Sequence, residues 1–218
     1  MILTFVRHAQ SKGNLDRKAY KEYGDQNVPL SELGEQQAIQ LQKFLNHIDL
    51  KTTPIITSEY LRTHQTAQGA LPGAVFSQDA RLNEWSAPHH MHLSEEELQK
   101  TEDGRTFLFG RMRSDFTPLA GRGFPEMKKN LRSFVRELEK NQSIDHVVVF
   151  AHAGVIRLFL DVYVDKVDPI YYNRNYEKTT LKNASIHQLE FRKDWKLLQT
   201  LTLESRKRDI RTFQQRTK

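Results

Sequence analysis

The sequence predicts an α/β protein in which a mainly parallel sheet carries helices on both faces. Three short runs, at residues 2–6, 54–57 and 146–150, are continuously apolar and rich in β-branched residues, which is typical of strands buried on both faces. Each run precedes a polar turn and then apolar residues at helical spacing. Strands and helices that alternate in this way form parallel sheets covered by their crossover helices.

Two helices are predicted from their caps and stops. Ser31 can cap a helix that continues to about residue 47, because apolar residues recur there at steps of three and four. Ser58 occupies the N-cap position ahead of a second helix over residues 59–69, and Gly69 can end it.

A mostly helical insertion of about sixty residues is predicted over residues 85–143. Ser94 and Glu97 have the spacing of a capping box, and Pro125 begins a strongly amphipathic helix. We expect this insertion to form a partial lid over the functional site and to set the choice of substrate.

The C-terminal part predicts an antiparallel hairpin and a basic tail. Residues 186–191 and 195–203 flank a polar turn and form the hairpin at a sheet edge, which completes a single domain over residues 1–204. For residues 205–218 we favour a frayed, solvated terminus over a segment that binds nucleic acid or lipid. The cations of this tail are Arg206, Lys207, Arg208, Arg211, Arg216 and Lys218.

Composition excludes several classes of protein. Of the 218 residues, 38% are hydrophobic and 28% are charged, which allows a buried core and excludes collagen-like and disordered chains. The absence of cysteine excludes disulfides, cysteine-based metal sites and a cysteine nucleophile. No apolar run approaches the ~20 residues of a membrane helix. An apolar strand follows Met1 at once and leaves no room for a signal peptide, so we expect a cytoplasmic protein that binds no membrane.

The residues best suited to bind a ligand or to react with it lie at the ends of the predicted strands. Arg7 and His8 follow the first strand, Arg62 lies one helical turn beyond the second, and His152 follows the strand at residues 146–150. Because ligands of parallel sheets bind beyond the carboxyl ends of the strands, these side chains are expected to converge. The net charge of +6 also favours an anionic ligand.

These residue types favour phosphate chemistry. A guanidinium group can donate two hydrogen bonds to two oxygens of one phosphate. Because the chain has no cysteine, a neutral imidazole is the candidate nucleophile that could attack phosphorus. A single histidine at a strand end is more often structural, and an arginine early in a helix usually pairs with a carboxylate. Spacing alone therefore predicts a phosphate-binding protein and leaves phosphoryl transfer open.

The same residues resemble a known family. Residues 7–14, Arg7-His8-Ala9-Gln10-Ser11-Lys12-Gly13-Asn14, are similar to the signature Arg-His-Gly-x-[Ser/Thr]-x-x-Asn of the histidine phosphatase superfamily, the phosphoglycerate-mutase-like proteins. Further blocks follow in the family's order: Leu30-Ser31-x-x-Gly34-x-x-Gln37-Ala38, Thr57-Ser58-x-x-x-Arg62-x-x-Gln65-Thr66-Ala67, Leu82-x-Glu84 and Ala151-His152-Ala153-Gly154-x-Ile156-Arg157. The resemblance covers residues 1 to about 160 and implies the three-layer sandwich of the phosphoglycerate mutases.

The resemblance implies a role for each matching residue. His8 would become phosphorylated, and Glu84 would act first as general acid and then as the base for water. Arg7, Arg62 and His152 would hold the phosphoryl group. No metal and no other cofactor would be required.

Two backbone or amide donors complete the implied phosphate site, and the sequence departs from the family pattern at Ala9 and Ala153, where glycine is usual, and more seriously after the acid. Asn14 and the backbone N–H of Ala153 would donate hydrogen bonds to the phosphate. The glycine usual after the acid is replaced by Trp85-Ser86-Ala87-Pro88, which puts the placement of Glu84 in question. Substitutes for this acid in the insertion, which we rate below it, are Glu95, Glu96 and Asp103.

Two features of the insertion have more than one interpretation. The cluster His89-His90-x-His92 lacks carboxylate or cysteine partners at metal-ligand spacing, so we favour a solvated or substrate-facing loop over a metal site. Arg111 and Arg113 follow Phe107 and Phe109, and they can contact an anionic leaving group or pair with nearby acids.

The sequence thus predicts a metal-independent phosphatase that hydrolyses phosphate monoesters of a small or medium metabolite through a phosphohistidine. One alternative is phosphoryl transfer of the phosphoglycerate mutase type. Another is a catalytically weak module that binds phosphate or nucleic acid. We expect a small phosphorylated substrate and no nucleic-acid partner, and the oligomeric state stays open.

Overall fold

The computed structural model describes residues 1–110, 115–118, 121–141, 143–167 and 181–216, and within them lies a six-stranded sheet in the order β3-β2-β4-β1-β5-β6. The strands are β1 (Ile2–Arg7), β2 (Ile55–Thr57), β3 (Ser77–Gln78), β4 (His146–Ala151), β5 (Ile186–Phe191) and β6 (Trp195–Leu201). The first four pair in parallel, and β5 and β6 extend the sheet antiparallel beside β1. The predicted α/β class with a mainly parallel sheet is confirmed.

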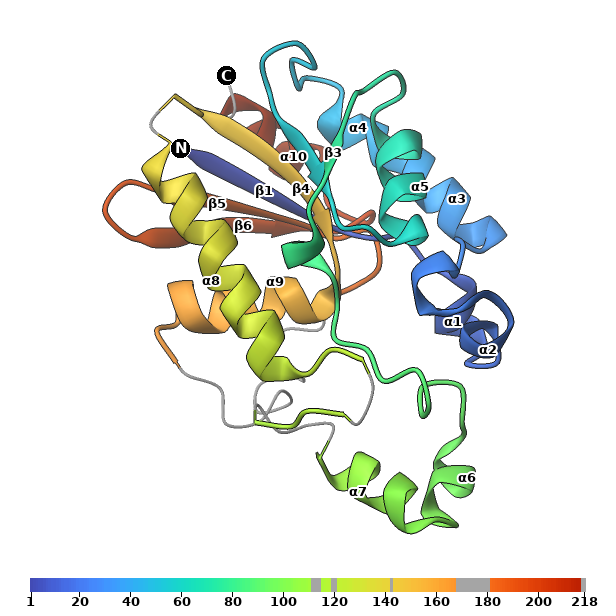
Figure 1. Ribbon diagram of the computed structural model, residues 1–218. Helices are drawn as coiled ribbons and strands as arrows, with labels where there is room; N and C mark the ends of the chain where they lie inside the picture. The colour runs from blue at the N-terminus through green and yellow to red at the C-terminus, as the bar shows by residue number, and fades with distance from the viewer. Residues whose placement is uncertain (111–114, 119–120, 142, 168–180, 217–218) are drawn as a thin grey trace.

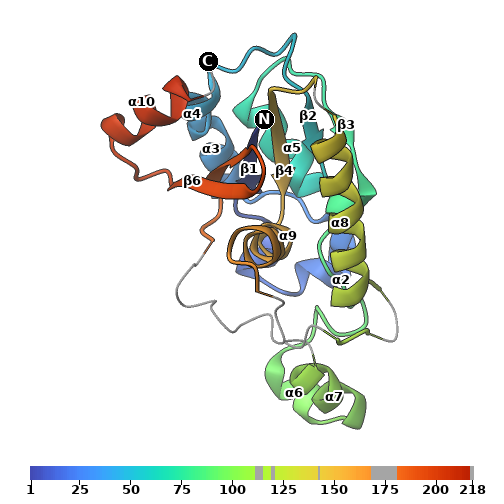
Figure 2. The ribbon, with the colours of Figure 1, turned by 90° about the vertical axis from the view of Figure 1, so that its left-hand side faces the viewer.

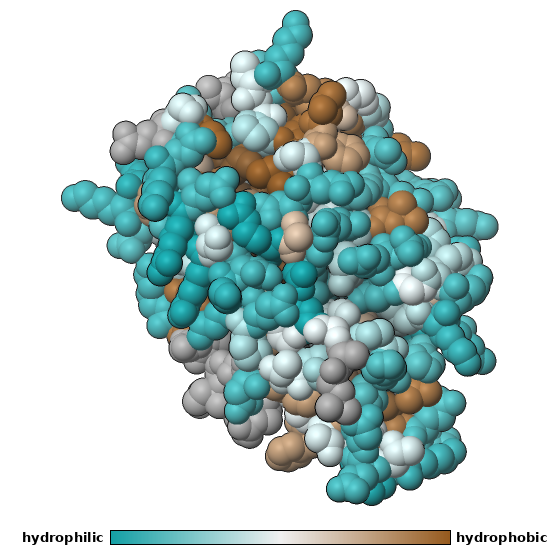
Figure 3. All heavy atoms as spheres, in the orientation of Figure 1, coloured by the Kyte–Doolittle hydropathy of each residue, from teal (hydrophilic) through white to brown (hydrophobic). Residues whose placement is uncertain are grey.

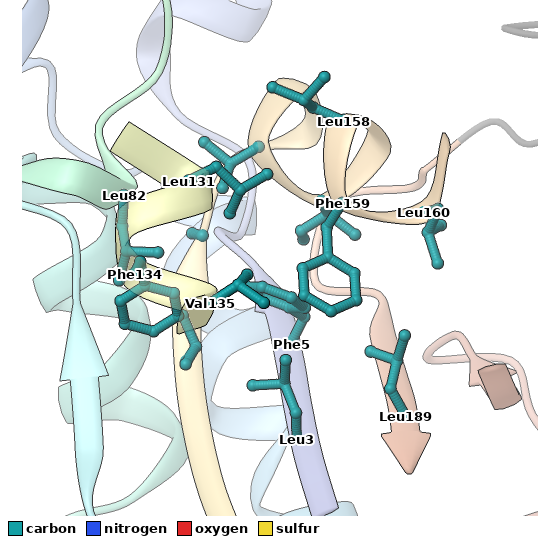
Figure 4. Close-up of a cluster of buried hydrophobic side chains, with 14 of the residues drawn as sticks. Leu3, Phe5, Leu82, Leu131, Phe134, Val135, Leu158, Phe159, Leu160 and Leu189 are labelled. Carbon is teal, nitrogen blue, oxygen red and sulfur yellow. The ribbon is translucent and has the colours of Figure 1, made fainter. Parts of the chain in front are cut away.

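The two central strands, β1 and β4, bury side chains on both faces, as their unbroken apolar runs predict. Leu3 and Phe5 point into one core cluster, whereas Val6 points into a second cluster on the opposite face. This alternation follows from the two-residue repeat of a strand. Figure 4 shows Leu3 and Phe5 in the first cluster, with the ring of Phe5 beside that of Phe159.

Helices cover both faces of the sheet and complete a three-layer sandwich (Figures 1 and 2). One face carries α3 (Glu32–Gln40), α4 (Gln42–Leu45), α5 (Leu61–Ala70) and α10 (Lys207–Gln215), and the other carries α8 (Phe124–Lys140) and α9 (Ala153–Phe159). The remaining elements are α1 (Lys12–Leu15), α2 (Ala19–Tyr23), η1 (Asp25–Asn27), η2 (Ala80–Leu82), α6 (Glu95–Gln99), α7 (Glu102–Gly110) and η3 (Leu160–Val164). Of these, η2 and η3 also contribute apolar residues to the first core cluster.

The first two predicted helices form, with different details at their ends. Ser31 caps α3 as expected, because its hydroxyl accepts a hydrogen bond from the backbone N–H of Gly34 at 3.1 Å. The prediction that Ser58 caps the next helix was wrong. The N-cap of α5 is Tyr60, and the Ser58 hydroxyl lies within hydrogen-bond distance of His152 instead. Ser58 therefore contacts His152 and does not cap α5.

The insertion contains two parts that differ in packing. Helices α6 and α7 form a small unit around Leu98 and Phe107 and lie apart from the sheet in Figure 1, with the predicted capping box of Ser94 and Glu97 in place. Helix α8, by contrast, packs Phe134 and neighbouring apolar residues directly on the sheet. Among the described residues of the insertion, α6 and α7 thus stand clear of the sandwich, whereas Trp85 and α8 pack against its core.

The frayed terminus expected for the basic tail was wrong for residues 207–215. These residues form α10, which packs the fully buried ring of Phe213 and the partly buried Ile210 against the second core cluster. The two apolar residues are three positions apart and therefore share one helical face. The cations occupy the rest of the helix surface.

The surface of the protein is dominated by polar side chains on the face drawn in Figure 3. No helix in the described ranges is both long enough and apolar enough to cross a lipid bilayer.

Candidate active site

The predicted site residues meet where β1 and β4 end. Arg7 pairs with Ala151 in the parallel register, so the next residues, His8 and His152, leave adjacent strands at the same level. Their imidazole rings lie with centroids 5.3 Å apart at an interplanar angle of 60°. Because the strands are parallel, both rings lie beyond the same edge of the sheet.

His8 is buried, and its ring orientation leaves one nitrogen free for chemistry. The Nδ1 atom lies 2.7 Å from the carbonyl oxygen of Ala9. A carbonyl only accepts hydrogen bonds, so Nδ1 carries the proton and Nε2 keeps its lone pair. Burial and the charges of Arg62 and Arg7 lower the pKa of His8 well below its usual range. The ring is consequently neutral at physiological pH, as a nucleophile requires.

The loop after His8 is held by side chains of α3 and α5. The backbone N–H of Ala9 donates to Oγ1 of Thr66 at 3.0 Å, and that of Gln10 donates to Oε1 of Gln37 at 2.9 Å. A β-carbon on Gly34 would overlap the carbonyl of Gln10, so only glycine allows α3 to approach this closely. Residues of the second and third sequence blocks thus fix the backbone that follows His8.

His152 is fully buried and is oriented by Ser58. Oγ1 of Thr63 donates to the carbonyl of Tyr60 at 2.7 Å, which leaves it free to accept from the Ser58 hydroxyl at 2.9 Å. The Ser58 oxygen then accepts from Nε2–H of His152 at 2.8 Å. Nδ1 of His152 is buried, and it makes no hydrogen bond within the described residues.

The charge state of His152 depends on what occupies the site. Burial, followed by the charges of Arg62, His8 and Arg7, lowers its pKa well below the usual range. A bound phosphate dianion would oppose these effects, so His152 can take a proton at Nδ1 and donate it as a hydrogen bond when phosphate binds.

The two predicted arginines reach the site from different segments. Arg62 is 4% exposed and donates from Nη1 to the backbone oxygen of Asp25 at 2.7 Å. Arg7 donates from Nη1 to the carbonyl of Leu181, just before β5. Both guanidiniums act on His8 and His152, since the charge of each lowers the pKa of both rings.

Glu84 lies at this site, despite the altered sequence after it. Its two carboxylate oxygens accept hydrogen bonds from the backbone N–H groups of Gly154, at 2.8 Å, and Trp85, at 3.1 Å. Burial raises the pKa of Glu84, and the two N–H donors and the charges of Arg62 and Arg7 oppose the rise. A carboxyl group with a raised pKa is suited to donate a proton near neutral pH.

The substitutes considered for Glu84 are engaged elsewhere. Glu95 and Glu96 are exposed on α6, and Glu96 pairs with Lys100. Asp103 lies 2.6 Å from Nε2 of His90 within the small α6–α7 unit. The structure places none of the three beside His8.

Asn14 and Ala153 present donors at the site. Oδ1 of Asn14 accepts from the Ser11 backbone at 3.0 Å and from Nδ2 of Asn183 at 3.2 Å, which leaves its own Nδ2 to donate. Ala153 begins α9, so its N–H has no acceptor within the helix. Asn183 also donates to the carbonyl of His8 at 3.2 Å.

The histidine cluster of the insertion does not converge. His90 is buried and stacks on Phe107 with ring centroids 4.5 Å apart, whereas His89 is exposed and His92 faces the Pro88 carbonyl at 3.3 Å. In the part of the chain that the structure describes, no group of three or more histidine or carboxylate side chains could hold a metal ion. Residues 111 and 113, the arginines predicted near the leaving group, lie outside the described residues.

Sequence reasoning missed Asp25, Tyr60 and the segment before β5. Asp25 and Tyr60 contact Arg62, and residues 181–184 contact Arg7 and His8. These contacts join residues far apart in the chain, and in the sequence they carry no signal beyond a polar or aromatic residue in a loop.

Comparison with known proteins identifies the family. The family model of the histidine phosphatase superfamily (branch 1) matches residues 3–203. The chain belongs to the histidine phosphatase superfamily, and its enzyme class is that of a histidine phosphatase.

Curated relatives match only a part of their length. The chain is 27% identical over 160 residues to 6-phosphofructo-2-kinase/fructose-2,6-bisphosphatase 1 of Mus musculus, covering 73% of this chain and 32% of the relative. It is 28% identical over 161 residues to isoform 3 of Homo sapiens, covering 73% of this chain and 29% of the relative. The chain thus spans less than a third of these proteins.

Solved structures with the same fold match almost end to end. A putative α-ribazole-5'-P phosphatase from Escherichia coli has a TM-score of 0.76 at 18% identity, with 93% of this chain and 97% of that chain covered. A mycobacterial glucosyl-3-phosphoglycerate phosphatase has a TM-score of 0.69 at 24% identity, with 90% and 96% covered. At these identities the likeness establishes the fold.

Proposed function

We propose that this protein hydrolyses phosphate monoesters of a small or medium metabolite through a phosphohistidine at His8, without a metal ion. The observation that carries the proposal is the 2.7 Å contact between Nδ1 of His8 and the carbonyl oxygen of Ala9, from which the tautomer of the ring follows. Its Nδ1 is bound to the Ala9 carbonyl, so the lone pair of Nε2 is available beside His152. The positive charge of the arginines would neutralise the phosphoryl oxygens, as Mg²⁺ does in other phosphoryl-transfer enzymes.

The first step transfers the phosphoryl group to the enzyme. Nε2 of His8 attacks phosphorus in line as the bond to the leaving oxygen breaks, and Glu84 gives that oxygen its proton. The guanidiniums of Arg7 and Arg62 and the protonated His152 offset the charge of the equatorial oxygens. The alcohol then leaves.

The second step returns the enzyme to its starting state. The Glu84 carboxylate, now ionised, takes a proton from water, and the resulting hydroxide attacks phosphorus. The bond from phosphorus to Nε2 breaks, and inorganic phosphate is released. Both steps use the same carboxyl group, which fits the opposing influences of burial and N–H donors on its pKa.

The α6–α7 unit is the proposed determinant of the substrate. It lies beyond the sheet edge at which β1 and β4 end (Figures 1 and 2), and Nε of Arg17 donates to the Met91 carbonyl at 2.8 Å, joining the insertion to the segment near α2. The similar structures are named for α-ribazole-5'-P and glucosyl-3-phosphoglycerate, which supports a phosphorylated sugar or sugar-acid derivative as substrate.

The test is hydrolysis of an aryl phosphate in the presence of EDTA. We expect turnover by the wild type, an acid-labile phosphoryl adduct on His8 after rapid quenching of labelled substrate, and loss of both in His8→Ala. His89→Ala, which removes an exposed imidazole, is the control and should retain activity. Undiminished turnover in His8→Ala, or turnover abolished by EDTA, would contradict the proposal.

A further inference from the structure

Arg62 donates two hydrogen bonds to a single residue, Asp25. Nη1 donates to the backbone oxygen of Asp25 at 2.7 Å, and Nη2 lies 3.3 Å from its Oδ1. Asp25 begins η1, a short turn between α2 and α3 that contains none of the family blocks. The pair is nearly closed to water, with 4% of the Arg62 side chain and 9% of the Asp25 side chain exposed.

Tyr60 completes the arrangement from the other side. Its ring lies under the guanidinium, with 4.5 Å from the ring centroid to Cζ of Arg62. Its hydroxyl donates to Oδ2 of Asp25 at 3.4 Å. The guanidinium is therefore fixed in its plane by the ring and fixed in rotation by the two hydrogen bonds to Asp25.

A buried ion pair of this kind is a poor source of stability. Removing both charges from water costs about as much as their attraction returns, and often more. The pair therefore calls for a role other than holding the fold together. Orientation of the guanidinium is such a role. A guanidinium that donates two parallel hydrogen bonds to a phosphate must be held with its plane in a defined orientation.

The hydrogen bonds to Asp25 leave the other edge of Arg62 for a ligand. Nη1 and the outer side of Nη2 face Asp25, and Nε makes no hydrogen bond to any residue that the structure describes. Nε and the second N–H of Nη2 form a planar fork that matches two phosphate oxygens. The same guanidinium acts on His8 and His152 by its charge.

We propose that Asp25 is a positioning residue, which holds Arg62 so that its free Nε–Nη2 edge faces the phosphoryl group. This rests on the proposed function, because it assumes that Arg62 binds phosphate. Asp25 itself touches no substrate. It acts through the two hydrogen bonds that it accepts from Arg62.

The experiment is a double-mutant cycle read out by binding rather than turnover. The dissociation constant of inorganic phosphate is measured by calorimetry for the wild type, Asp25→Ala, Arg62→Ala and the double variant. We expect Asp25→Ala to weaken binding about tenfold or more, as loss of a supporting partner does in metal sites. In the Arg62→Ala background the same change should have no further effect, because Asp25 then has nothing to orient.

Two variants separate orientation from folding. Asp25→Asn keeps an oxygen acceptor for Nη2 without the charge, and it should restore part of the affinity that Asp25→Ala loses. Glu22→Ala removes an exposed carboxylate from the neighbouring α2 and should bind phosphate like the wild type. If Asp25→Ala does not fold, the cycle is run with Asp25→Asn, for which we expect a smaller loss of the same kind.

Other outcomes would overturn the proposal. Tighter phosphate binding in Asp25→Ala would show that Asp25 competes with phosphate for Arg62. Equal losses in the wild-type and Arg62→Ala backgrounds would show that Asp25 acts independently of Arg62. A wild type that binds phosphate but forms no phosphohistidine would contradict the proposed function alone, because the cycle requires no turnover.

Discussion

Glu84 accepts a hydrogen bond from the backbone N–H of Gly154 at 2.8 Å, at a point where a β-carbon on residue 154 would overlap the carboxylate. Gly154 is the second residue of α9 and follows His152 by two positions. One helical turn therefore carries the second imidazole and also fixes the proposed acid. The absence of a side chain at residue 154 is what allows the two groups to share one site.

The first prediction concerns Gly154→Ala. The new methyl group should displace Glu84, so that hydrolysis of alkyl phosphates falls about 10–100-fold, with a smaller loss for aryl phosphates, whose leaving oxygen needs less help from an acid. The measurement is kcat/KM for both ester classes. Gly69→Ala is the control for crowding as such, since its β-carbon would lie 2.7 Å from that of Ala38, between α3 and α5, which hold the loop after His8 and, among the residues that the structure describes, make no hydrogen bond to Glu84. It should change the hydrolysis of both ester classes by the same factor and leave the alkyl-to-aryl ratio unchanged. An unchanged alkyl-to-aryl ratio in Gly154→Ala would count against the positioning of Glu84.

The second prediction concerns the pH dependence of Glu84. Its pKa is raised above the ordinary 4.5, and the proton must be present for transfer to an alkyl leaving group. Rising pH should therefore lower the ratio of alkyl to aryl kcat/KM through the pKa of Glu84, and using the ratio cancels the ionisation of the substrate phosphate. In Glu84→Gln the ratio should be low and independent of pH. A ratio that still varies with pH in this variant would assign the proton to another group.

The third prediction concerns Ser58. Ser58→Ala removes the acceptor of Nε2–H of His152, so the ring loses its fixed orientation and leaves a buried N–H unsatisfied. We expect phosphate affinity and kcat/KM to fall about 10–100-fold, in line with the loss of supporting partners at other sites. Ser77→Ala, an exposed serine of β3, should leave both unchanged. Wild-type phosphate affinity in Ser58→Ala would show that Ser58 does not orient the ring.

The fourth prediction concerns stability at mildly acid pH. His187 is buried on β5 between hydroxyls of Ser185 and Thr200, and burial lowers its pKa to about 4. Below the ordinary value of 6.5, the unfolded chain takes up a proton at His187 before the folded protein does, so stability falls as pH drops from about 6.5 to about 4. From pH 7 to pH 5 this residue alone should cost about 2 kcal/mol of the free energy of unfolding.

Urea unfolding at pH 7 and pH 5 measures this effect. His187→Asn removes the titrating group, so the difference between the two pH values should shrink by about 2 kcal/mol relative to the wild type. His89→Asn, an exposed imidazole, should leave the difference unchanged. An equal pH difference in His187→Asn and the wild type would exclude this residue as the cause.

The sheet was predictable because its central strands are buried on both faces. A run such as residues 146–150 needs no partner to be recognised, and the carboxyl end of a parallel strand locates His152 without any tertiary information. The convergence of Arg7, His8, Arg62 and His152 followed from that topology. Their roles in catalysis stay predictions, as does the role of Glu84.

The rest depended on tertiary packing that short patterns do not encode. In α10, only Ile210 and Phe213 mark a buried face within a basic run, and their burial depends on the core cluster they meet. Ser58 resembles an N-cap in sequence, yet its hydroxyl forms a hydrogen bond with His152, which lies 94 residues further along the chain. Asp25 gave no signal, because a carboxylate in a polar loop is ordinary until Arg62 is placed beside it.

The antiparallel hairpin has a consequence for the smallest fragment that could work. The carbonyl of Leu181 accepts a hydrogen bond from Arg7. The carbonyl of His8 accepts one from the N–H of Ala184 at 3.3 Å, just before β5 begins. A truncated chain ending after α9 would retain every residue proposed to react, but it would lack residues 181–184, which contact Arg7 and His8. We therefore expect the smallest active fragment to be longer than the stretch that bears the motifs. Truncation from the C-terminus should impair activity before it removes any of the proposed catalytic side chains.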